Sequence, residues 1–269
     1  MKTKKSSSHN ITLEQARRVL EVVDAGLCSG LGQPTPGQMC VEAAVCYALG
    51  QPHGDEPECV APAVRAFKIA LNDAAWSDNA ARAAGMRRIA IAQLGTAGRI
   101  DETQFAQELA LQTVRQILPI ALRATASPHP DAAHKAALEG AASACEAVLD
   151  LSAADSAAYS AYLTARLAYS AAYSADSAAR SAAYSAAYSA YSAARSAYSA
   201  YSADSALYSA LYLAVDSAVD SAYSAADSAY SAADSAARNK VLSLMAEIGV
   251  QALRVAGAAG VKLMDKLCQ

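Results

Sequence analysis

Apolar residues recur at helical spacing along the first 150 residues of the chain. Thr12 and Gln15 have the spacing of a capping box, and the apolar stripe that follows from Val19 predicts a helix to about Cys28. The same periodicity predicts further helices over 38–49, 61–74, 78–94, 101–125 and 131–150. No stretch alternates with a period of two for long enough to indicate a strand. This part of the chain is therefore expected to be an all-α bundle.

A different pattern begins at about residue 151. Tyr, Asp and Arg recur every three or four residues from Asp155 to Arg238, through a background of Ala and Ser. Their mean spacing of about 3.6 residues equals the α-helical repeat, so the stripe follows one face of a helix. No Gly or Pro interrupts it, and one unbroken helix is the preferred interpretation. The alternative is a hairpin with its bend between Arg195 and Asp204, where successive gaps are all three residues.

Changes in composition divide the chain into four segments. They are a basic, disordered arm (1–10), a helical bundle domain (11–150), an Ala/Ser/Tyr low-complexity helical repeat (151–238) and C-terminal amphipathic helices (239–269). In the last segment, Gly257 and Gly260 separate two predicted helices, of which the first carries an apolar stripe that includes Val241 and Ile248. The expected fold is all-α: an N-terminal bundle, a long repeat helix or helical hairpin, and a short C-terminal helix pair.

Composition and charge narrow the classes of function. The 269 residues include 22 Lys and Arg against 25 Asp and Glu, which argues against a dedicated nucleic-acid binder because such proteins carry a basic surplus. No uncharged apolar run approaches the roughly 20 residues of a membrane span. The six cysteines and the lack of a recognisable signal peptide predict reduced thiols in a cytoplasmic protein.

The stripe of the repeat is a candidate recognition surface, because Tyr among Ser and small residues gives rigid contact area at little entropic cost. The residues expected to bind a partner are Tyr184, Tyr188, Tyr191, Arg195, Tyr198, Tyr201, Tyr208 and Tyr212. Asp outnumbers Arg in the stripe, which disfavours nucleic acid as the partner. Under the alternative interpretation, the tyrosines pack between alanine-faced helices and support the fold.

One apolar cluster stands out within the repeat. Its members recur every four residues and are Leu207, Leu211, Val215 and Val219. Apolar side chains on an otherwise alanine-rich helix must pack on another surface. They are expected to contact another helix of the same chain or to form a self-association patch.

The bundle contains one candidate for catalysis. Cys40 lies near the start of a predicted helix, whose dipole favours a thiolate, and His53 and Asp55 are possible partners. These residues define an alternative function, a cysteine-dependent hydrolase or transferase, although buried structural thiols are the default expectation. The spacing of Cys46, His53 and Cys59 matches no zinc pattern, so no metal and no cofactor are expected.

Two further features concern the region from Trp76 to Arg88. Trp76, the only tryptophan, is expected to fill the core at a helix junction. The basic residues Arg82, Arg87 and Arg88 are expected on a solvated helix face.

The run Ala-Ala-Tyr-Ser-Ala-Ala-Tyr-Ser-Ala at 182–190 resembles the alanine-rich helical repeats of predicted immunity proteins from bacterial polymorphic toxin systems. Those relatives more often carry Ala where this chain has Ser. Segments 37–44 and 71–95 resemble an uncharacterised bacterial or phage helical module. The first resemblance implies a protein that binds and blocks a toxin without catalysis of its own.

The function expected from the sequence is that of a non-enzymatic helical interaction or assembly protein. Its expected partner is another protein or a second copy of the chain, and neither nucleic acid nor membrane. A cysteine-dependent enzyme centred on Cys40 and a purely structural, self-assembling helical protein are the alternatives.

Overall fold

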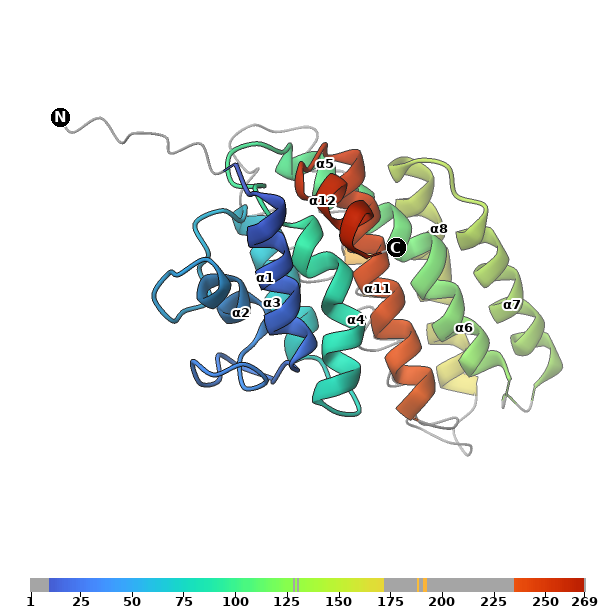
Figure 1. Ribbon diagram of the computed structural model, residues 1–269. Helices are drawn as coiled ribbons and strands as arrows, with labels where there is room; N and C mark the ends of the chain where they lie inside the picture. The colour runs from blue at the N-terminus through green and yellow to red at the C-terminus, as the bar shows by residue number, and fades with distance from the viewer. Residues whose placement is uncertain are drawn as a thin grey trace.

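The computed structural model describes residues 10–127, 129, 131–171, 188, 191–192 and 235–268. Regular structure in these residues is helical, so the predicted all-α class is confirmed (Figure 1). The first helices are α1 (Leu13–Asp24), α2 (Val41–Ala48), α3 (Pro62–Asp73), α4 (Asn79–Ala92) and α5 (Glu102–Gln112). The π-helix η1 (Thr113–Ile117), α6 (Leu118–Ala126), α7 (Ala132–Glu146), α8 (Leu151–Ala171), α11 (Ser235–Val255) and α12 (Gly260–Leu267) follow.

The ends of α1 illustrate how local sequence sets the helices. The predicted capping box is present: the Thr12 N–H donates to Gln15 Oε1 over 2.9 Å, and the Gln15 N–H donates to Thr12 Oγ1 over 3.2 Å. The helix ends at Asp24, before the expected Cys28, because Gly26 takes a φ of 116°. Glycine adopts this left-handed conformation readily and so ends the helix.

The single helix predicted over 101–125 is divided in the structure. The α-helical hydrogen bonds of α5 give way to the five-residue π-helix η1, and Pro119 then lies at the start of α6. Proline has no N–H and its ring clashes with the carbonyl one turn earlier, so a regular helix cannot pass through it unchanged. The wider π turn accommodates this break, and the Leu118 N–H donates to the Thr113 carbonyl.

A first core joins α1 to α5 with α11 and α12. Large side chains fill it, and the rings of Phe67 and Phe105 meet edge to face with their centroids 6.1 Å apart. Trp76 is 6% exposed, as the sequence predicted, and its Nε1–H donates to the Leu71 carbonyl over 2.9 Å. Its ring packs directly over Gly85 of α4, where a Cβ would overlap it. This core is therefore closely packed around bulky residues.

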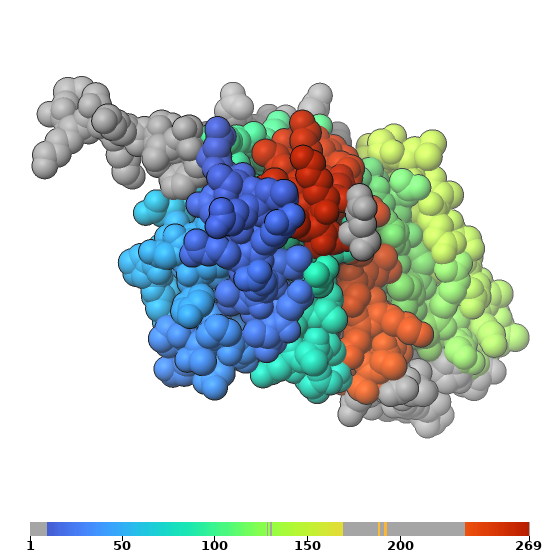
Figure 2. Space-filling model, in the orientation of Figure 1, coloured from blue at the N-terminus to red at the C-terminus, as the bar shows by residue number. Residues whose placement is uncertain are grey.

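The C-terminal helices belong to this first core. The two predicted tail helices are present, and Gly257, with a φ of 76°, lies between them. Helix α11 packs on α4 and α5, while α12 packs on α4 and also touches α1. Figure 2 accordingly shows segments from both ends of the chain side by side on one face of the molecule.

A second core lies among η1, α6, α7 and α8, on the other side of α11 from α1 (Figure 1). Helix α8 contributes a stripe of small buried residues, namely Ala154, Ala158, Ala161, Ala165 and Ala168. Leu122 and Leu138 face them from α6 and α7. Alanine lets helices approach closely but buries little apolar area per residue.

The tyrosine rings of the repeat overturn the preferred unbroken helix. The ring centroids of Tyr159 and Tyr191 are 5.3 Å apart, and those of Tyr162 and Tyr188 are 5.8 Å apart. At about 1.5 Å per residue, one straight helix would separate Tyr159 from Tyr191 by roughly 48 Å. The earlier tyrosine of α8, Tyr159, pairs with the later residue Tyr191, and the later one, Tyr162, pairs with the earlier residue Tyr188, so the order of the partners is antiparallel to α8. Tyr188 and Tyr191 therefore lie back beside α8, which one straight helix does not allow. The bend expected between Arg195 and Asp204 lies outside the described residues.

Candidate functional site

Cys40 lies where the sequence placed it, at the N-terminal end of α2. It is the N-cap residue, and its Sγ accepts a hydrogen bond from the Ala43 N–H over 3.3 Å. The thiol is only 4% exposed, and burial raises its pKa, although the N–H groups of Ala43 and Glu42 oppose that rise. A raised pKa leaves the thiol protonated at neutral pH, which is the opposite of what a nucleophile needs.

The two proposed partners of Cys40 behave differently. His53 is exposed, and its Nε2 lies 3.2 Å from the carbonyl oxygen of Gly32. Asp55 does line the same small cavity as Cys40, together with Glu42, Asn72 and Asp73. That cavity has a volume of about 40 Å³, enough for a water molecule or two but too small for an organic substrate.

A fully buried ion pair lies beside Cys40, and sequence reasoning missed it. Lys68 Nζ of α3 is 2.8 Å from Glu42 Oε1 of α2, and both side chains are 0% exposed. Gln93, the C-cap residue of α4, is buried next to them. Burial raises the pKa of Glu42 and lowers that of Lys68, while the attraction between the two charges opposes both shifts. The pair therefore joins α2 to α3, beside Gln93 at the end of α4.

The sequence did contain a signal for this pair. Lys68 follows Val64 and Phe67 and precedes Leu71 at helical spacing, so it falls on the buried face of α3. Glu42 stands within an almost continuous apolar run. Charged residues in such positions are rarely buried unless they are paired, so each of them predicts a partner.

The remaining buried thiols are also poor nucleophiles. Burial raises the pKa of Cys46 to about 12, and it raises the pKa of Cys59 as well. Among the residues that the structure describes, no group of three His, Cys, Asp or Glu side chains could hold a metal ion. The arrangement around Cys40 can therefore stabilise the bundle, but it lacks an accessible reacting group.

The expectation of a solvated basic face on α4 was wrong for Arg82. This side chain is buried and donates to the carbonyls of Asn72 and Leu27 over 2.8 Å and 3.2 Å. It thereby satisfies acceptors at the end of α3 and after α1, where helix carbonyls lack partners. Arg87 and Arg88 are partly exposed and pair with Asp24 and Glu247.

The tyrosine pairs form the described part of the predicted recognition stripe. Tyr159 is 47% exposed and Tyr188 is 55% exposed, although each of them contacts another tyrosine. Tyr162 and Tyr191 are half-buried against the second core. The rings therefore do both things that the sequence allowed: they pack between helices, and they leave aromatic surface open to solvent.

Most of the predicted binding stripe lies outside the described residues. This holds for Tyr184, Arg195, Tyr198, Tyr201, Tyr208 and Tyr212. The self-association patch of Leu207, Leu211, Val215 and Val219 also lies outside them. Only Tyr188 and Tyr191 of the predicted binding residues are placed.

Comparison with protein-family models, with curated proteins and with solved structures found no match for this chain. None of the described helices combines the length and apolar character that crossing a bilayer requires.

Proposed function

We propose that this chain is a non-enzymatic helical interaction protein that recognises a protein partner, or a second copy of itself, through the tyrosine face of its repeat. The observation that carries the proposal is the solvent-exposed ring surface of two tyrosine pairs, Tyr159 with Tyr191 and Tyr162 with Tyr188. Tyr combines a large apolar ring with a hydroxyl, which makes it a frequent contact residue at interfaces.

Mutual packing of the rings supports recognition as well as stability. A tyrosine held by a neighbouring ring loses less conformational freedom when a partner binds, so more of its contact energy remains as affinity. Toxin neutralisation, which the sequence resemblance implies, belongs to the same class because it also acts by binding. Assembly into a purely structural homo-oligomer would use the same face against a second copy.

Cysteine-dependent catalysis receives less support from the geometry. Its nucleophile would be a buried thiol with a raised pKa, and His53 contacts a backbone carbonyl instead. Thiol labelling of the folded protein with an uncharged maleimide tests this alternative. Cys28 and Cys268 are partly exposed and should react first. Rapid labelling of Cys40, with loss of a measurable hydrolytic activity, would favour the enzyme.

The proposal is tested by changing the exposed rings without removing the buried ones. We expect Tyr159→Ala with Tyr188→Ala to lower the average molar mass at high protein concentration and to release captured partner proteins. Tyr159→Phe with Tyr188→Phe is the matched control, because it keeps the rings and should keep most of the association. Sedimentation equilibrium and quantitative affinity capture measure the two effects.

Thermal unfolding of the same variants separates recognition from structural support. Each alanine also removes one ring contact, so a modest fall in melting temperature is expected in either case. A recognition face predicts, in addition, weaker association of the folded variant at temperatures well below its melting point. If the alanine variant melts earlier but associates and captures as the wild type does, the tyrosines serve only the fold and the proposed function fails.

A further inference from the structure

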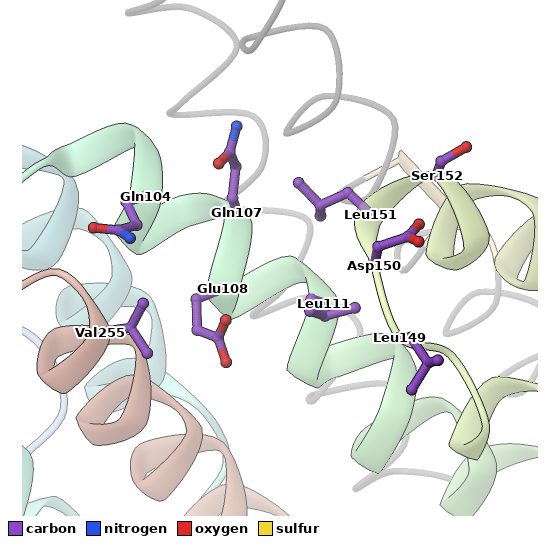
Figure 3. Close-up of a pocket in the computed structure, with 9 residues that line it drawn as sticks. All are labelled: Gln104, Gln107, Glu108, Leu111, Leu149, Asp150, Leu151, Ser152 and Val255. Atoms are coloured by element: carbon purple, nitrogen blue, oxygen red, sulfur yellow. The ribbon is translucent and has the colours of Figure 1, made fainter.

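An apolar groove opens where the first and second cores meet. It has a volume of about 510 Å³ and is lined by residues of α5, of the turn between α7 and α8, of the first turn of α8, and of the end of α11. Figure 3 shows Glu108 and Val255 on facing sides of it, with Leu111 and Leu149 at the other end. This volume lies within the range of about 300–1,000 Å³ that small-molecule sites occupy.

The floor of the groove is aliphatic and open to solvent. It is formed by Leu111, Leu149, Leu151 and Val255. Leu149 is 83% exposed and Val255 is 48% exposed, so both present apolar surface to solvent. Leu149 is held there because it directly precedes Asp150, whose Oδ1 accepts the Ala153 N–H at the start of α8. A leucine held in this position offers its apolar surface to a bound molecule.

The polar lining of the groove has one sign of charge. Glu108 and Asp150 supply two carboxylates, Gln104, Gln107 and Ser152 are neutral, and none of the described lining residues is basic. One oxygen of each carboxylate accepts a hydrogen bond from a residue three or four positions later. Glu108 Oε1 accepts from the Gln112 side-chain amide, and Asp150 Oδ1 accepts from the Ala153 N–H. Neither carboxylate forms an ion pair with another described residue. Their charges therefore remain to attract a cation.

We propose that this groove binds a small organic cation with an aliphatic body, such as an alkylamine. The aliphatic chain lies on Leu111, Leu149 and Val255, and the ammonium group is attracted by the negative charge that Glu108 and Asp150 give to the lining. This site is separate from the tyrosine face, and its occupancy does not depend on the function proposed there. It goes beyond that function by assigning a ligand class to a second surface.

Three probes with the same tail test the proposal: n-octylammonium, octan-1-ol and octanoate, titrated into the full chain below their micelle concentrations. We expect octylammonium to bind most tightly, the alcohol more weakly and the carboxylate most weakly, by calorimetry. Raising the ionic strength should weaken octylammonium binding and leave octanol binding nearly unchanged, since salt screens charge and not apolar contact.

Variants of the lining residues locate the binding. Glu108→Gln with Asp150→Asn removes both charges, and Asn remains a good N-cap, so the fold is kept. This variant should bind octylammonium about three- to tenfold more weakly and octanol equally well. Leu149→Ser should weaken both probes by roughly fivefold, because each loses apolar contact.

Matched controls lie elsewhere on the surface. Asp78→Asn neutralises the exposed N-cap of α4, and Leu31→Ser shortens a leucine that is 42% exposed outside the groove. Both should leave probe binding unchanged. Equal affinity for octylammonium and octanoate would overturn the proposal, as would binding that ignores the groove variants. Binding of a basic amphipathic peptide there, without binding of octylammonium, would show a protein-docking groove instead.

Discussion

The two cores of this protein are built from different materials. The first buries Phe67, Phe105 and other bulky residues around a buried ion pair, whereas the second packs a stripe of alanines in α8 against α6 and α7. Burial of a large apolar side chain contributes about 1.5–3 kcal/mol, and alanine contributes much less. The second core therefore depends more on stabilising contacts at its edges, where tyrosine rings and arginine–glutamate pairs lie. Single changes should have unequal effects in the two regions.

The largest effect is expected in the first core, from Lys68→Met. Without the ammonium group, Glu42 would stay buried without its ion-pair partner, and breaking a buried pair in this way destabilises a protein by about 3–5 kcal/mol. Urea unfolding of the variant and the wild type at pH 7 measures the difference.

A double variant, Lys68→Met with Glu42→Leu, is the control for this prediction. It removes both charges, so most of the lost free energy of unfolding should return. If Lys68→Met alone is as stable as the wild type, the pair does not hold α2 to α3 as described.

Two glycine substitutions compare the regions directly. A Cβ at Gly249 of α11 would overlap Phe67 and Ile89, whereas a Cβ at Gly140 of α7 would meet nothing. We expect Gly249→Ala to lower the free energy of unfolding by about 1–3 kcal/mol through overpacking. Gly140→Ala should raise it by about 0.5–1 kcal/mol, because alanine favours the helix. Denaturation curves of both variants and the wild type measure these changes. A stabilising Gly249→Ala would contradict the close packing described for the first core.

Changes in the tyrosine pairs should have a smaller effect on the free energy of unfolding, and the effects of the two partners should be coupled. A double-mutant cycle on Tyr159→Ala and Tyr191→Ala should find a coupling of about 0.5–1.5 kcal/mol, typical of aromatic pairs. Tyr47 is 44% exposed in the first region and lies on α2. The cycle of Tyr47→Ala with Tyr191→Ala should therefore give a coupling near zero. Equal coupling in both cycles would mean that the ring contact with Tyr159 carries no energy.

The features that the sequence could predict are those set by residues close together in the chain. Local chemistry set the capping box at Thr12 and the two tail helices, and these predictions are confirmed. The long-range pairing of Lys68 with Glu42 depends on how α2 and α3 meet, which periodicity alone does not specify. The straight repeat helix was wrong for a related reason. An Ala/Ser/Tyr sequence has a strong helical period but few residues that distinguish one packing partner from another. Several arrangements of helices therefore satisfy it equally well.

The smallest expected effect is at the edge of the second core and depends on pH. Arg123 donates to Glu146 Oε2 over 2.9 Å, and this hydrogen bond lowers the pKa of Glu146 below its usual 4.5. A carboxyl whose pKa is lower in the folded state stabilises the fold above the unfolded pKa, and this stabilisation disappears as the pH falls through the folded pKa. Both side chains are more than one-third exposed, so solvent keeps the contribution below about 1 kcal/mol.

Glu146→Gln should therefore lower the urea midpoint slightly at pH 7 and leave it equal to that of the wild type at a pH well below 4.5. Added salt at pH 7 should shrink the difference, since the pair is exposed to screening. The same substitution cannot change the first core, whose ion pair is shielded from both salt and solvent. A difference that persists at low pH or at high salt would mean that Glu146 acts through packing, and the second core would then depend on side-chain contacts more than on charge.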